Sequence, residues 1–100
     1  MPKITMETLH SLGREEAARR LKEKFGAVRD RYASHVNNLQ EKWVDHTFSF
    51  GFKAMGMGVT GTVRVEDASV KLNAELPLAA MLFKGSIERQ IRQELSGLLA

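Results

Sequence analysis

Alternating apolar and polar positions fill the middle of the chain and predict a series of one-sided β-strands. The clearest is Thr47 to Lys53, where three phenylalanines alternate with serine, glycine and lysine. Similar alternation predicts strands at 39–43, 59–65 and 70–76, and a short edge strand at 3–9. Because the connections between the last four strands are short, they favour an antiparallel meander.

Two segments instead carry apolar residues at intervals of three and four, which is the period of a helix. The first stripe runs to about Ser34, and we expect Ser11 to cap this helix. Outer ion pairs are expected between Glu15 and Arg19 and between Glu16 and Arg20. The stripe comprises Ala17, Leu21, Phe25, Val28 and Tyr32.

The second stripe extends from about Leu78 to Leu99, with an outer pair between Glu88 and Arg92. Its regular helix begins either near Leu78 or at Gly85, with Ser86 as the cap. The apolar positions of this stripe are Phe83, Ile87, Ile91, Leu95 and Leu98 or Leu99.

One-sided strands and one-sided helices must cover each other. The order of elements therefore predicts an α+β fold in a single domain over residues 1–100. We expect an antiparallel meander sheet of about four to five strands, with an N-terminal and a C-terminal helix packed on one face. This is a reduced helix-grip-like arrangement.

The composition is that of an ordinary globular chain, with 43% hydrophobic and 27% charged residues. There are no cysteines, which excludes disulfides and thiolate metal sites and fits a reducing cytoplasm. The N-terminal segment lacks a signal-peptide pattern, and no apolar run has the length of a membrane span. We therefore expect a cytoplasmic protein.

The formal net charge of +3 is mild and does not favour a dedicated nucleic-acid binder. Its excess is concentrated on the first helix, where acidic residues are interspersed with the basic ones. A solvated face with ion pairs explains this pattern, and weak polyanion binding is the alternative. The basic residues concerned are Arg19, Arg20, Lys22 and Lys24.

Catalytic and cofactor motifs are not convincing. The run Gly56 to Gly61 matches GxGxxG, but a strand follows it where dinucleotide binding requires a helix. His10, His35 and His46 lack the spacing of metal ligands, and His10 has a capping or packing explanation. No serine elbow or paired carboxylates are evident, so we expect no enzymatic activity, no cofactor and no metal.

A set of aromatic and methionine side chains gives the chain an adaptable apolar surface. Ordinary core packing is one interpretation of this set, and a cavity or partner surface is the other. Its members are Trp43, Phe48, Phe50, Phe52, Met55, Met57, Met81 and Phe83.

Several short segments, taken in order, resemble the polyhydroxyalkanoic acid system protein family. They include His10 to Gly13 before an alanine- and arginine-rich helix, the lone Trp43, and the strand Phe48 to Phe50. The others are Gly61 to Val65, Leu76 with Pro77, and Phe83 to Glu88. The methionine- and glycine-rich stretch at 55–58 departs from the family pattern.

The resemblance implies a small cytoplasmic bacterial protein associated with storage polyester granules, and it supplies no active site. Our hypothesis is a non-enzymatic accessory protein that engages an apolar partner. That partner is the granule surface, a granule protein or a small hydrophobic acyl compound. The exposed edge expected at the first strand would also permit pairing into a homo-oligomer.

Overall fold

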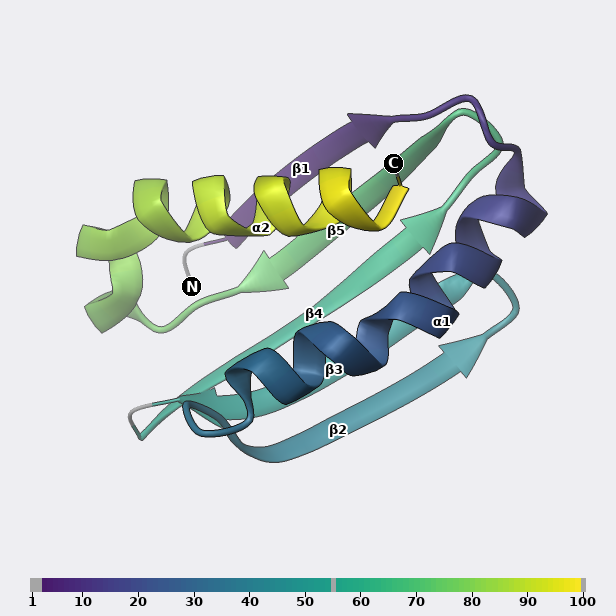
Figure 1. Cartoon of the computed structure of the whole chain (residues 1–100). Coiled ribbons are helices and arrows are strands. Elements are labelled where there is room, and N and C mark those ends of the chain that lie inside the picture. Colours follow the sequence, from purple (N-terminus) through teal and green to yellow (C-terminus); the bar gives the residue numbers. More distant parts are fainter. Residues whose placement is uncertain (1–2, 55, 100) are drawn as a thin grey trace.

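The computed structural model describes residues 3–54 and 56–99, and its elements follow the predicted order. A short strand and a helix come first, followed by four strands, a 3₁₀ segment and a final helix (Figure 1). The elements are β1 (Lys3–Leu9), α1 (Arg14–Tyr32), β2 (Asn37–Val44), β3 (Thr47–Ala54), β4 (Met57–Val65), β5 (Ser69–Glu75), η1 (Leu78–Phe83) and α2 (Lys84–Leu99).

The five strands form one antiparallel sheet in the order β1-β5-β4-β3-β2. The meander of β2 to β5 was predicted from the short connections, and β1 joins it at the free edge of β5. Because β1 and β2 are the two outer strands, the connection between them, which contains α1, must cross the sheet from one edge to the other. The predicted edge position of 3–9 is therefore confirmed.

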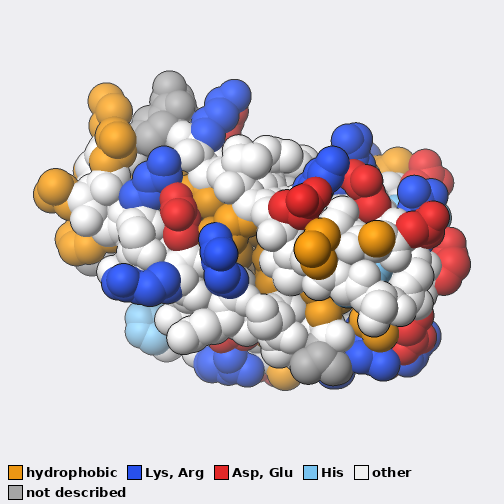
Figure 2. Space-filling model, turned by 90° about the horizontal axis from the view of Figure 1, so that it is seen from above, with side chains coloured by type: hydrophobic (Ala, Val, Ile, Leu, Met, Phe, Trp, Pro, Cys, Tyr) orange, Lys and Arg blue, Asp and Glu red, His pale blue; other side chains and the backbone are white. Residues whose placement is uncertain are grey.

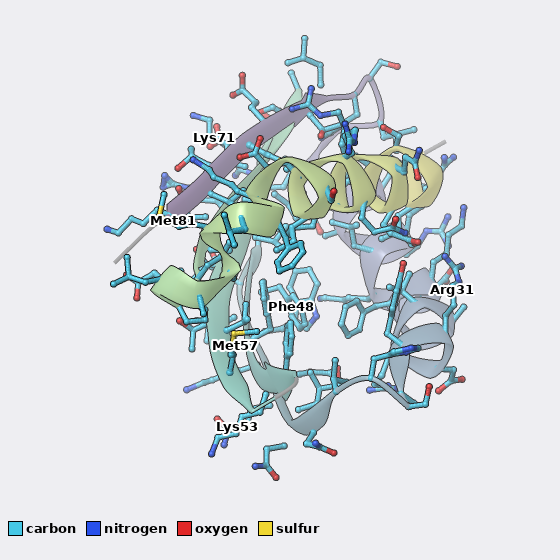
Figure 3. The ribbon with its side chains drawn as sticks, turned by 90° about the vertical axis from the view of Figure 1, so that its left-hand side faces the viewer. Arg31, Phe48, Lys53, Met57, Lys71 and Met81 are labelled. Atoms are coloured by element: carbon cyan, nitrogen blue, oxygen red, sulfur yellow. The ribbon has the colours of Figure 1, made fainter. Side chains whose placement is uncertain are left out.

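Both helices cover the same face of the sheet (Figures 1 and 3). α2 lies against β1 and α1, while α1 lies over the half of the sheet that contains β2, β3 and β4. Glu94 on α2 accepts hydrogen bonds from Arg31 and Tyr32 on α1, and Gln90 donates to the Tyr32 hydroxyl at 2.6 Å. The predicted α+β arrangement with two helices on one face is confirmed.

The core lies between the sheet and the two helices. Ile4, Val65 and Val70 are its most completely buried large side chains. α1 contributes Ala17, Ala18 and Leu21, and α2 contributes Leu95 and Leu99. β1, β3, β4 and β5 therefore each bury one face, as their alternation predicted, whereas the inner side chains of β2 are only half-buried.

Some local predictions were wrong. Gly13, not Ser11, occupies the position before α1, because its φ of 82° and ψ of 157° are accessible essentially only to glycine. β2 begins at Asn37, before the predicted range of 39–43, and Asn38 adopts a φ of 55° at a shift of register inside it. The α-helix α2 begins at Lys84, after the 3₁₀ turns of η1.

The ion pairs of the helices also differ from expectation. The carboxylate of Glu16 forms the predicted ion pair with Arg20, and it forms a second ion pair with Arg19. Glu15 contacts His46 instead of Arg19. On α2, Glu88 pairs with Lys84, one turn before it, whereas Arg92 was expected.

Candidate functional site

The aromatic side chains predicted on the strands form a stacked row inside the fold. Phe48 is 5% exposed, and its ring centroid lies 4.9 Å from that of Phe25 and 5.1 Å from that of Trp43. Phe50 and Phe52 continue the row towards the end where η1 lies, with centroids 6.2 Å apart. Phe48 therefore lies between the sheet and the helices in Figure 3.

Gly61 shows how tightly this row is packed. A Cβ atom added there would lie 2.6 Å from Cζ of Phe50 and 2.7 Å from the carbonyl oxygen of Asn73. The ring of Phe50 thus occupies the space that a side chain at position 61 would need. This is the close contact expected of a glycine in a strand, and it favours core packing over a cavity at this point.

The methionines and Phe83 do not join the aromatic row as one surface. Met57 is half-buried at the start of β4, and Met55 lies outside the described residues. Met81 and Phe83 are 50% and 60% exposed, so core packing does not account for these two members of the set. Figure 3 shows Met81 at the periphery, away from Phe48.

Met81 and Phe83 belong to an exposed group on η1 that we call the apolar end: Leu78, Met81, Leu82 and Phe83. Leu82 is 89% exposed and Leu78 is 74% exposed. Figure 2 shows hydrophobic side chains gathered at the end of the molecule where η1 lies in Figure 1. Large exposed apolar groups of this kind mark interaction surfaces.

The local sequence explains why these side chains face outwards. Pro77 fixes an extended backbone, and its carbonyl accepts a hydrogen bond from the N–H of Ala80, which starts a 3₁₀ turn. With three residues per turn, a 3₁₀ helix presents different faces from an α-helix. Ala80, at 5% exposure, is the residue that η1 buries in the core.

The basic face of α1 is largely occupied by internal contacts. Arg19 is bonded to both Glu16 and Glu23, and Arg20 is bonded to Glu16. The ammonium of Lys22 lies 4.9 Å from the ring centroid of Trp43, and Lys24 is exposed. Hydrogen bonds from Arg19 and Arg20 lower the pKa of the Glu16 carboxyl to about 2. These contacts reduce the charge that α1 presents to a polyanion.

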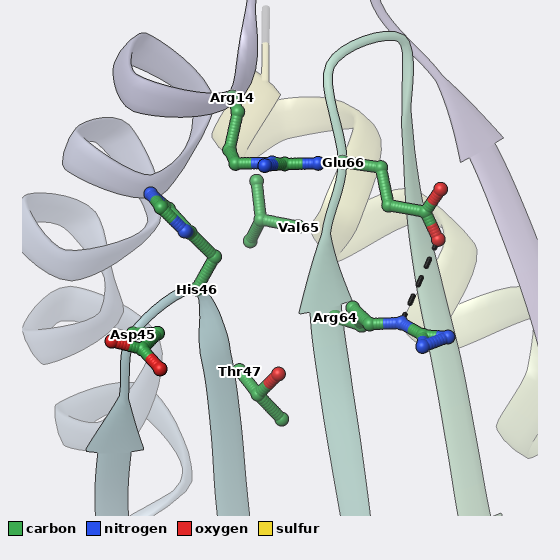
Figure 4. A pocket seen from close by; sticks show the side chains of 7 residues that line it. All are labelled: Arg14, Asp45, His46, Thr47, Arg64, Val65 and Glu66. Carbon is green, nitrogen blue, oxygen red and sulfur yellow. Dashed lines mark ion pairs between the residues drawn. The ribbon is translucent and has the colours of Figure 1, made fainter.

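A shallow polar pocket lies at the opposite end, beside the start of α1 (Figure 4). Nε2 of His46 is 2.6 Å from Oε1 of Glu15, and Arg64 pairs with Glu66 at 3.6 Å. Arg14, Asp45, Thr47 and Val65 complete its lining. Charges of both signs neutralise each other here, and the pocket is open to solvent. Within residues 3–54 and 56–99, no three acidic or histidine side chains are grouped as metal ligands.

His10 has a structural role that the sequence only hinted at. Its Nδ1 accepts a hydrogen bond from the N–H of Leu12, so the ring proton resides on Nε2. That Nε2–H lies 3.0 Å from the carbonyl oxygen of Glu66 and 3.3 Å from that of Ser69. His10 thereby joins the start of α1 to the turn between β4 and β5.

The loop after β3 also follows the expected pattern. Gly56 has a φ of 78° in a tight turn, and β4 begins at Met57. The GxGxxG match therefore leads into a strand, as predicted. Among the described helices, none combines the length and apolar character of a membrane span.

Fold and site together define a small α+β domain that packs its aromatic row around the buried Phe48 and presents one apolar end to the exterior. The family model described as "Putative polyhydroxyalkanoic acid system protein" matches residues 4–99, and the chain belongs to that family. The resemblance seen in the sequence is thus confirmed. No curated protein and no solved structure matches the chain.

Proposed function

We propose that the protein is a non-enzymatic accessory of the polyhydroxyalkanoate storage system. In this role it attaches to the polyester granule in the cytoplasm through the apolar end. The observation that carries the proposal is the exposure of four large apolar side chains within six consecutive residues: Leu78, Met81, Leu82 and Phe83. Membership of a polyhydroxyalkanoic acid system family supports the choice of the polyester as the apolar partner.

The shape of the apolar end suits a surface better than a small ligand. η1 projects from one end of a molecule that measures 36 × 22 × 22 Å (Figure 1). A projecting turn can insert side chains into a flat apolar surface without any matching groove. Full burial of a leucine, methionine or phenylalanine side chain is worth roughly 1.5–3 kcal/mol. Four such side chains are enough for reversible attachment to the polyester.

The aromatic row is the less favourable location for an acyl ligand. Phe48 is buried against Phe25 and Trp43, and Phe50 covers Gly61. A ligand there would have to displace packed rings, whereas the apolar end is already exposed. We therefore place the contact on η1.

Co-sedimentation with protein-free polyhydroxybutyrate particles tests the proposal. The double variant Leu82→Ser/Phe83→Ser should bind at least tenfold more weakly, because about 1.4 kcal/mol already changes an equilibrium constant tenfold. Leu9→Ser is the matched control, since Leu9 is 76% exposed but lies on β1, far from η1. Equal losses in the two variants, or wild-type binding no greater than that of an unrelated protein, would contradict the proposal.

Salt separates this proposal from attachment through the basic helix. Apolar binding should persist from low to physiological ionic strength, whereas contacts to a polyanion weaken steeply over that range. If binding is lost with salt and also in Lys22→Ala/Lys24→Ala, the contact belongs to α1. Binding only to granules that retain their proteins would identify a granule protein as the partner instead.

A further inference from the structure

We propose that β1 pairs with β1 of a second copy of this chain, antiparallel and centred on Thr5, to form a symmetric dimer. The two sheets would join edge to edge into one continuous sheet. This inference does not depend on the apolar end or on granule binding. It rests on the backbone and charge pattern of the β1 edge.

The two edges of the sheet differ in their protection against pairing. β2 is interrupted by a shift of register next to Asn38, and it carries Glu41 on the face that packs against α1. Glu41 is bonded there to Arg29 at 2.7 Å. Bulges and inward-pointing charges are established devices that prevent edge association. β1, in contrast, pairs with β5 in unbroken register from Lys3 to Leu9.

The backbone of β1 has alternate residues available for a partner. The N–H of His10 donates to the carbonyl of Ala68 at 3.0 Å, in register with the pairs of β1 and β5. Because hydrogen-bonded and non-bonded pairs alternate, Ile4, Met6 and Thr8 direct their backbone groups towards β5. Lys3, Thr5 and Glu7 therefore direct theirs outwards.

A two-fold axis at Thr5 places the outward-directed backbone groups of one β1 strand opposite those of the second copy. Thr5 then faces Thr5 of the partner subunit, and Lys3 faces Glu7 of the partner subunit. Each of these is a pair that exchanges two backbone hydrogen bonds. On the inner side, Ile4 is opposite Met6 of the partner subunit, so apolar residues also face apolar residues.

Charges on the outer face reinforce this register. Lys3 already lies 3.9 Å from Glu75, and Glu7 lies 3.9 Å from Lys71. In the dimer, the side chains that lie side by side across the four central strands are Glu75, Lys3, Glu7 of the partner subunit and Lys71 of the partner subunit. Their charges alternate in sign, and opposite charges on facing strands are favourable. The middle row contains Thr5, whose hydroxyl donates to Asn73 at 3.2 Å. Figure 2 shows acidic and basic side chains interspersed on the face that includes this edge.

The neighbouring symmetric register is poorer. An axis at Met6 would place Lys3 opposite Leu9 of the partner subunit and Thr5 opposite Glu7 of the partner subunit. That register forms no ion pair between facing residues. The order of charges along β1 therefore favours the axis at Thr5 and a second copy of the same strand.

Charge reversal tests the pairing directly. Wild-type protein should shift from 11.2 kDa towards twice that mass as its concentration rises from micromolar to millimolar in analytical ultracentrifugation. Lys3→Glu and Glu7→Lys each place like charges opposite each other, so each variant alone should associate at least tenfold more weakly. An equimolar mixture of the two variants restores opposite charges at every facing pair and should form a heterodimer.

The mixture keeps the test independent of folding, because a variant that failed to fold could not be rescued by its counterpart. A wild-type protein that stays monomeric at millimolar concentration would overturn the proposal. So would a mixture that associates no better than either variant alone.

A disulfide test fixes the register. The natural chain has no cysteine, so Thr5→Cys introduces a single thiol on the proposed axis. Facing residues of a hydrogen-bonded pair have Cα atoms about 5.5 Å apart, within the range of a disulfide. Lys3→Cys is the control, because its two copies would be about 15 Å apart, from four residues at ~3.4 Å per residue and the spacing between the two strands. Cross-linking that is no faster for Thr5→Cys than for Lys3→Cys would overturn the proposed register.

Discussion

The two ends of the molecule differ in whether their side chains contact the rest of the chain or the solvent. At one end, the ring of His10 is bonded to the backbone of Leu12, Glu66 and Ser69. At the other end, Leu78 and Leu82 are almost fully in solvent although they are apolar. The first end holds parts of the chain together, and the second is free to meet a partner. Substitutions should therefore reduce stability at the His10 end and binding at the apolar end.

The largest effect is expected from His10→Ala. The change leaves the N–H of Leu12 and the carbonyl of Glu66 without the ring as their partner, while the carbonyl of Ser69 keeps the hydrogen bond from the N–H of Glu66. An unpaired buried group costs about 1–3 kcal/mol. We expect the free energy of unfolding to fall by about 3 kcal/mol, the upper part of that range. Urea denaturation measures this fall.

Two further measurements sharpen the His10 result. Nitrogen NMR of the wild-type ring should show the Nε2–H tautomer, because Nδ1 accepts from Leu12. His35→Ala is the control, since the side chain of His35 is exposed and its one described hydrogen bond is to the neighbouring Ser34. A ring with its proton on Nδ1, or equal stability losses at both histidines, would show that His10 does not hold the turn.

The next effect is expected from Gly13→Ala at the same end. No atom lies within 4 Å of the added Cβ, so the cost comes from the backbone conformation alone. Non-glycine residues in such regions cost of order 1–3 kcal/mol, and we expect about 2 kcal/mol. Gly97→Ala is a suitable control, because Gly97 also has open space but lies within α2. It should stabilise the protein slightly, and a loss equal to that of Gly13→Ala would refute the conformational explanation.

A smaller effect on stability is expected at the apolar end. Leu82→Ser removes a side chain that is 89% exposed. The free energy of unfolding, measured by urea denaturation, should therefore change by less than about 0.5 kcal/mol. Ala80→Ser introduces the same hydroxyl at a buried position of the same turn and should be more damaging. If Leu82→Ser were the more destabilising of the two, Leu82 would be part of the core and not of a binding surface.

The smallest effect concerns the exposed ion pairs of α1. Hydrogen bonds from Arg19 and Arg20 lower the folded-state pKa of Glu16 from 4.5 to about 2. A lowered pKa stabilises the fold above the unfolded value, and that contribution disappears as the pH falls from about 4.5 to about 2. Glu16→Gln should therefore flatten the stability profile slightly in that window only. A difference in stability between the two proteins that stays unchanged down to pH 2 would assign Glu16 another role.

The sequence predicted the sheet well because four of its five strands bury one face. Alternation at Phe48, Phe50 and Phe52 reflects direct contact with the core, and the structure keeps all three on the inner side. The edge position of β1 was also evident, because its pattern is short. Local periodicity was sufficient wherever a single element decides which residues are buried.

The apolar end was not predicted as one surface, because the second apolar stripe extends the period of an α-helix through residues 78–83. That period placed Phe83 on the same stripe as Ile87 and Ile91. In the structure, Pro77 and Ala80 begin a 3₁₀ turn, and Phe83 is exposed. A signal was present in the sequence: the run Leu78 to Phe83 contains no polar residue and therefore cannot be amphipathic.

The start of α1 was mispredicted for a different reason. Ser11 has the chemistry of a cap, but the ring of His10 bonds the N–H of Leu12 and two distant carbonyls. The two carbonyls belong to Glu66 and Ser69, in a turn more than fifty residues away from His10. A local rule cannot anticipate a competing bond from so remote a segment. The choice between Ser11 and Gly13 is made by tertiary structure.

The position of β1 beside β5 has a consequence for how the polypeptide reaches its native state. The hairpins of β2 to β5 connect neighbours in sequence, whereas Leu9 must find Ser69 across almost the whole chain. Closing so long a loop carries an entropic cost that slows assembly. We expect the meander to form first and the N-terminal strand to dock late. In stopped-flow refolding, substitutions at Ile4 or Met6 should chiefly accelerate unfolding and leave the refolding rate nearly unchanged.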